Sequence, residues 1–203
     1  MFSLEELLGQ QQGTQAVEQI SQNLGANSSV VNSAIQIALP AIIGGLAKNA
    51  QSPQGAQNLD NAISQDHSGG GLLDNLMGYL GGGIPSPQEA TRETNGGGIL
   101  GHIFGGNQTQ VAEQVSQQSG LNMGQVAQLL ITLAPIVMSY LGQQKQQQNL
   151  DAGGLSNWLG GQQQQIQQSP QSSLINSILD RDGDGSAMDD LASMAFNYVT
   201  NRK

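Results

Sequence analysis

The chain has 203 residues, of which 10% are charged and 3% aromatic, and six Lys or Arg stand against fifteen Asp or Glu for a formal net charge of -9. This length can bury one sizeable hydrophobic core, and the acidic balance excludes a basic surface for nucleic acid. The absence of Cys excludes disulfides, thiol catalysis and Cys-ligated metals, and two isolated His leave oxygen atoms as the candidate metal ligands.

The N-terminal residues predict a cytoplasmic protein. Residues 1–6 (MFSLEE) contain neither a basic stretch nor a long apolar stretch. A secretory signal peptide needs both features. We therefore expect no signal peptide and a cytoplasmic location.

The first half of the chain recurs in the second half as an internal repeat. Residues 14–46 align without a gap over residues 109–141. Each copy has an amphipathic helix, a glycine suited to end it, an asparagine that can cap the next helix, and a long apolar helix with an internal proline. The aligned pairs include Gly25 with Gly120, Asn27 with Asn122, and Pro40 with Pro135. We therefore expect two pseudo-symmetric helical repeats.

The second helix of each copy, at about residues 28–48 and 123–144, is apolar on most faces and contains no charge before Lys48 and Lys145. Polar residues and the prolines limit each strongly apolar stretch to about 13 to 16 residues, fewer than the roughly 20 that span a bilayer. The Val- and Ile-rich segments follow the helical period rather than the strand period. We predict an all-α, multihelical fold with two buried central helices.

Clusters of Gly and Pro divide the chain into segments. We interpret the glycine clusters, among them 69–71, 96–98, 105–106, 153–154 and 160–161, as hinges between helices. The predicted organisation is helical repeat 1 at 1–83, a Pro- and Gly-rich linker at 84–98, helical repeat 2 at 99–161, and a Gln-rich segment with an acidic loop and flanking helices at 162–203.

The sharpest chemical motif lies near the C-terminus, at residues 180–186 (DRDGDGS). Carboxylates at alternate positions with glycine at the sixth form the opening of an EF-hand calcium loop, because the glycine permits the bend that brings the side chains around one ion. Apolar faces on either side predict the two flanking helices. We expect one Ca²⁺ ion, with ligands from Asp180, Asp182, Asp184, the backbone carbonyl of Ser186, and Asp190.

The calcium loop departs from the standard pattern at its twelfth position, where Leu191 replaces the bidentate Glu. Asp190 supplies the final ligand if the outgoing helix begins one residue early, and Asp189 is the other choice. Carboxylates this close repel one another unless a cation is present. The alternative is an acidic turn in which Asp184 or Ser186 caps a helix. Because the loop has no partner loop, we expect a structural ion rather than a sensor.

Several blocks of sequence carry a family pattern. They are residues 41–56 (AIIGGLAKNAQSPQGA), residues 73–76 (LDNL) and residues 179–186 (LDRDGDGS), the last followed by Asp189, Asp190 and Leu191. They resemble the YidB-like bacterial family of unknown function, DUF937. The resemblance covers most of the chain and implies a multihelical fold with buried central helices. It implies no established activity.

No arrangement of residues predicts an enzyme. Gly96, Gly98 and Gly101 fit the spacing of a dinucleotide-binding loop, but no strand precedes them. Residues 66–68 (DHS) are consecutive and therefore cannot converge as a catalytic triad. We expect His102 to occupy a partly exposed helical position.

Low charge and abundant Gln and Gly permit close contact between helices. We therefore expect a non-enzymatic, calcium-binding structural or protein-interaction module that self-associates or binds a protein partner. The alternative is a membrane-active or secreted protein whose apolar, Pro-containing helices insert into lipid.

Overall fold

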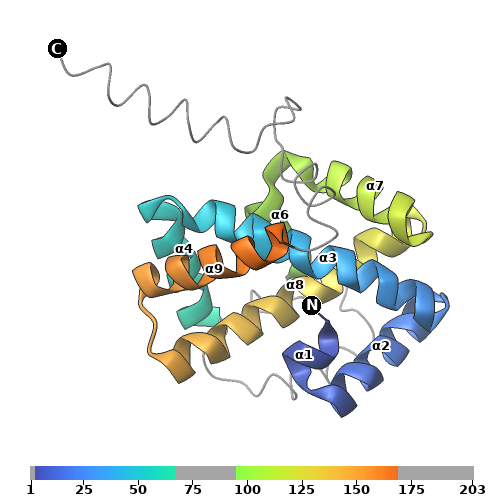
Figure 1. Ribbon diagram of the computed structural model, residues 1–203. Coiled ribbons are helices and arrows are strands. Elements are labelled where there is room, and N and C mark those ends of the chain that lie inside the picture. Colours follow the sequence, from blue (N-terminus) through green and yellow to red (C-terminus); the bar gives the residue numbers. More distant parts are fainter. Residues whose placement is uncertain (1–2, 67–94, 169–203) are drawn as a thin grey trace.

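The computed structural model describes residues 3–66 and 95–168, and within these ranges it contains helices and no strand (Figure 1). The predicted all-α fold is confirmed for this part of the chain. The elements are α1 (Leu4–Leu8), α2 (Gln10–Leu24), α3 (Ser28–Ala50), α4 (Pro53–Asp66), α6 (Gly96–Phe104), the 3-10 helix η1 (Gly105–Asn107), α7 (Gln108–Ser119), α8 (Met123–Gln148) and α9 (Ala152–Gln167).

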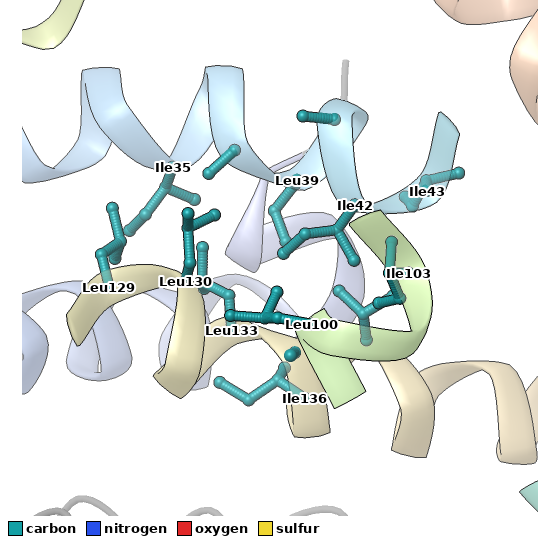
Figure 2. Close-up of a cluster of buried hydrophobic side chains, with 14 of the residues drawn as sticks. Ile35, Leu39, Ile42, Ile43, Leu100, Ile103, Leu129, Leu130, Leu133 and Ile136 are labelled. Carbon is teal, nitrogen blue, oxygen red and sulfur yellow. The ribbon is translucent and has the colours of Figure 1, made fainter. Parts of the chain in front are cut away.

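The two long apolar helices, α3 and α8, lie at the centre of the molecule. α3 packs against α2, α4, α6, α7, α8 and α9, and α8 also packs against α2, α4, α6 and α7. Figure 2 shows Ile35 and Leu39 of α3 facing Leu129, Leu130 and Leu133 of α8 in the hydrophobic core. A helix that is apolar on most faces is stable in water when other helices surround it. The expected burial of both central helices is confirmed.

Length and composition alone do not distinguish α3 and α8 from membrane-spanning helices. Each contains an 18-residue window apolar enough to cross a bilayer, so the expectation that their apolar stretches are too short is wrong. Isolated polar residues such as Gln36, between Ile35 and Ile37, are outweighed by their neighbours over such a window. Within the molecule, 78% of the window in α3 and 61% of that in α8 is buried. This burial is the property of core helices.

The turns before α3 and α8 use the residues that the sequence predicts. Gly25 ends α2 with a left-handed backbone at φ 59°, and Gly120 ends α7 at φ 83°. A side chain at φ > 0 is strained, so glycine suits both positions. The side chain of Asn27 accepts a hydrogen bond from the Ser29 amide at 3.0 Å, and that of Asn122 accepts from the Gln125 amide at 3.0 Å. These predicted helix ends and caps are confirmed.

Three glycine clusters lie inside helices, so the prediction that they are hinges is wrong. Residues 96–98 form the first turn of α6, and residues 153–154 and 160–161 belong to α9. The residue before each of these helices acts as its cap. Asn95 accepts from the Gly98 amide at 2.9 Å, and Asp151 accepts from the Gly154 amide at 2.7 Å. Capping and packing therefore offset the low helix propensity of glycine.

Gly96 allows α6 to approach the backbone of α8. A Cβ atom at this position would overlap the carbonyl oxygen of Ile131. Ile131 lies four residues before Pro135, which has no N–H to donate to that carbonyl within the helix. The carbonyl group to which Pro135 cannot donate is therefore the one that lies against Gly96, the first glycine of α6. This contact sets the position of α6 on the core.

We predict that Gly96→Ala lowers the free energy of unfolding by about 1–3 kcal/mol, because the added methyl group collides with the α8 backbone. Gly97→Ala is the matched control. A Cβ there lies 3.8 Å from the nearest atom, Oδ1 of Asn95, and alanine favours helix over glycine by up to about 1 kcal/mol. Urea unfolding followed by circular dichroism measures both variants. A Gly96→Ala protein as stable as the unsubstituted chain would contradict the contact.

Candidate functional site

The five expected calcium ligands, Asp180, Asp182, Asp184, Ser186 and Asp190, lie outside the described residues, as does His67. Over residues 3–66 and 95–168, no group of three or more His, Asp or Glu side chains is placed to hold a metal ion. Calcium binding therefore stays a prediction that rests on the sequence motif. The site that the described residues form is of a different kind.

An open groove of about 590 Å³ lies between α4 and α6, with α3 and α8 beneath it. This volume falls within the range of about 300–1,000 Å³ that is typical of ligand pockets. In Figure 1, α4 lies next to the C-terminal end of α3, and α6 is partly hidden behind α3. The residues that line the groove are Leu46, Asn49, Ser52, Gln54, Gly55, Asn58, Leu59, Asn61, Ala62, Gln65, Ile99, His102, Ile103 and Met138.

The α4 wall consists of two adjacent rows of residues. Gly55, Leu59 and Ala62 form the deeper row, and Leu59 is buried. The outer row is a ladder of four exposed amide side chains, spaced four, three and four residues apart so that they share one helix face. We call this row the amide ladder: it consists of Gln54, Asn58, Asn61 and Gln65. Uncharged amides thus follow the rim along most of α4.

Contacts at the start of α4 hold the ladder in place. Ser52 caps the helix, because its Oγ accepts a hydrogen bond from the Gly55 amide at 3.0 Å, and Pro53 occupies the first helical position. A Cβ atom at Gly55 would overlap the carbonyl oxygen of Asn49. Glycine is therefore required where the first turn of α4 passes the end of α3.

Lys145 fixes the rotation of α4 about its axis. Its Nζ lies 2.5 Å from Oδ1 of Asp60 and donates to Oγ of Ser64. Asp60 and Ser64 are four residues apart, so both project from one face of α4 toward α8. Because α8 holds this face, the ladder residues Asn58 and Asn61 face the groove.

The opposite wall is the face of α6 that carries Ile99, His102 and Ile103, the last of which is labelled in Figure 2. Asn49 of α3 holds this wall. Its Nδ2 donates hydrogen bonds to the carbonyl oxygens of His102 at 2.8 Å and Ile103 at 3.1 Å. Carbonyls in the last turn of a helix lack intrahelical donors. The Asn49 side chain of α3 therefore supplies the hydrogen-bond donors that α6 lacks at this end.

The groove offers hydrogen bonding without charge. No Asp, Glu, Lys or Arg is among the residues that line it, although His102 and five amide side chains are. Each amide carries a carbonyl acceptor and two N–H donors. The floor is apolar, with Leu46 of α3 and Met138 of α8 both buried. The arrangement suits an uncharged ligand that has both donors and acceptors beside apolar groups.

Tyr140 has a perturbed pKa but lies away from the groove. Burial raises the pKa of its hydroxyl, and the negative charge of Glu6 raises it further. The Tyr140 ring packs against that of Trp158 with their centroids 6.2 Å apart. The perturbed tyrosine therefore belongs to the packing of α8 against α9, and the groove does not use it.

Sequence reasoning missed the groove, although one signal of it was present. His102 occupies an exposed helical position, close to the expectation, but its place on the α6 wall was not foreseen. The spacing of Gln54, Asn58, Asn61 and Gln65 marks a single polar helix face and could have identified the ladder. Nothing local indicates that α6 lies opposite.

Comparison with known proteins gives one match. The model of a family described as "Bacterial protein of unknown function (DUF937)" matches residues 6–144. This range contains every residue that lines the groove and ends before α9 and the acidic loop. No curated protein and no solved structure matches the chain.

We predict that Asn49→Ala lowers the free energy of unfolding by about 1–2 kcal/mol, since two hydrogen bonds to the end of α6 are lost. Gln117→Ala is the control, because it removes a bond from Gln117 to Glu113 on the exposed surface of α7, 3.4 Å long, and is expected to change stability by less than about 0.5 kcal/mol. Thermal unfolding compares the two. Equal stability of both variants would contradict the role given to Asn49.

Proposed function

The chain belongs to the bacterial family of unknown function DUF937, and we propose that it is a non-enzymatic helical binding module whose ligand occupies the groove between α4 and α6. The observation that carries this proposal is the lining of the groove: exposed amides on one rim, an apolar floor and no charged side chain. Binding an uncharged ligand needs these groups. His102 is the one titratable side chain among the described residues that line the groove, and no Asp or Glu lines it to act with His102 in acid–base chemistry.

We also propose that the molecule consists of two pseudo-symmetric copies of one helical unit. The supporting observations are that α2 and α7 both end at a left-handed glycine and that α3 and α8 both begin at an asparagine cap. Pro40 and Pro135 lie inside the two long helices. In this arrangement α4 follows α3 within the first copy and α6 precedes α7 at the start of the second, so the groove lies where the two copies meet.

The C-terminal acidic loop is proposed to hold a structural Ca²⁺ ion. Its support is the D-x-D-x-D-G pattern at residues 180–185 and the mutual repulsion of its carboxylates without a cation. The described chain ends on the core, since Ile166 in the last turn of α9 is buried. A Ca²⁺ ion bound by residues 180–190 would neutralise the mutual repulsion of these carboxylates.

The alternative function, insertion of α3 and α8 into lipid, is supported by their length and composition. Their burial supports the binding module instead, because insertion would require both helices to leave the core that they share. A central helix that is already surrounded gains little apolar contact from lipid. We therefore retain the soluble binding module as the proposed function.

We predict that isothermal titration calorimetry of the full chain with CaCl₂ shows one binding site and that Asp182→Ala abolishes its heat, because that substitution removes one of the ligands expected at alternate positions. Glu113→Gln is the matched control, since it removes one carboxylate from the exposed surface of α7. Unchanged heat in the Asp182→Ala protein would refute the calcium site.

We also predict self-association, which is proposed because the low fraction of charged residues and the abundant Gln and Gly permit close contact between helices. Sedimentation velocity should give a mass above the 21.2 kDa of one chain, rising with protein concentration. The effect should strengthen as the pH falls from 7 toward the sequence pI of about 4.3, where the net charge vanishes. A constant mass of 21.2 kDa across concentration and pH would contradict self-association.

A further inference from the structure

The amide ladder runs along α4 for the length of a short extended polypeptide, with steps that are shorter than the same-side repeat of such a chain. With a rise of about 1.5 Å per residue, the steps from Gln54 to Asn58, Asn61 and Gln65 are about 6, 4.5 and 6 Å along the helix axis. An extended chain advances about 3.3 Å per residue, so groups on the same side recur about every 6.6 Å. The whole ladder spans about 16 Å, which is the length of about five extended residues.

The chemistry of the ladder also suits a polypeptide main chain. Each peptide unit presents one N–H donor and one carbonyl acceptor, and a side-chain amide can pair with both. Gln54 Nε2 donates to Asn58 Oδ1 at 3.0 Å. This bond orients two neighbouring ladder amides with respect to each other and uses one lone pair of Asn58 Oδ1. The Nδ2 hydrogens of Asn58 can donate to a carbonyl oxygen of the ligand.

The floor and the absence of charge narrow the class of ligand. Met138 on the floor is apolar, as are Leu59 and Ile103 on the two walls, so the groove favours apolar groups on the side of the ligand that faces inward. A charged group there would lose its hydration without gaining a partner, which disfavours phosphorylated or ionic ligands. No Phe, Tyr or Trp is among the described residues that line the groove, so a sugar would lack the large aromatic ring on which its apolar face could stack. An uncharged peptide satisfies all three conditions.

We infer that the groove binds an uncharged polypeptide segment in extended conformation, with its main chain along the amide ladder and alternate apolar side chains on the floor. This inference deepens the proposed function and rests on it. Hydrogen bonds to the main chain supply affinity with little dependence on sequence, and the apolar floor selects the side chains at every second position. The partner is therefore recognised by its lack of charge and its alternating pattern.

Selection from a phage-displayed library of random heptapeptides on the full-length protein tests this inference. We expect enriched peptides to lack Asp, Glu, Lys and Arg and to carry apolar residues at alternate positions. A synthetic copy of the most enriched peptide should bind about tenfold to a hundredfold more weakly to the double variant Asn58→Ala/Asn61→Ala. Both side chains are exposed, and the thermal unfolding midpoint of the variant verifies that it folds.

Gln57→Ala is the matched control, because Gln57 is an exposed amide on α4 that does not line the groove. It should bind the peptide as the unsubstituted protein does. Equal binding by the double variant, enrichment of charged peptides, or apolar residues at helical rather than alternate spacing would each overturn the inference.

A glycan array distinguishes failure of the inference from failure of the proposed function. If no peptide is enriched and an uncharged glycan binds in a manner that Asn58→Ala/Asn61→Ala abolishes, the peptide assignment is overturned and the groove remains a binding site. If neither peptides nor glycans bind, both the inference and the proposed binding function are overturned.

Discussion

The burial of α3 and α8 against each other is the constraint on which the rest of this fold depends. Both helices are apolar on most faces, so neither is stable in water until other helices cover it. The shorter helices provide this cover and present a polar outer surface. The core is built on two long helices, and the helices that cover it lie along their length. Two of these covering helices, α4 and α6, leave a groove between them.

Neutral side chains make most of the described polar contacts between helices. Gln125 Nε2 donates to the carbonyl of Leu24 at 2.9 Å, and Ser156 Oγ donates to that of Ala50 at 2.7 Å, so each satisfies the end of a neighbouring helix. Asn49 does the same for α6. Such contacts hold helix ends without the desolvation cost of buried charge. The uncharged groove is one instance of this general use of amides and hydroxyls. The same contacts position the helices relative to one another in a chain that has few charged residues.

The candidate sites differ in how far the sequence could reveal them. The acids at residues 180–190 were predicted as calcium ligands because such ligation depends on spacing within one short segment, as the alternation of Asp180, Asp182 and Asp184 illustrates, and this prediction lies outside the described residues. The groove was not found because its walls come from helices that precede and follow residues 67–94. The amide spacing on α4 was visible in the sequence. That these amides border a groove depends on Ile103 of α6 and Met138 of α8, and no local sequence pattern predicts that these residues lie near α4.

The sequence by itself determined the helical class, the two core helices and the turns before them, because periodicity, Gly25 and Asn122 act through the local backbone. It misjudged the glycines of α6 and α9, since caps and packing decide whether a glycine bends a chain. Only the tertiary structure decided the contact of Gly96 with Ile131, the rotation of α4 by Lys145, and the groove. These depend on the distance between residues far apart in the chain, and packing of the complete core sets that distance.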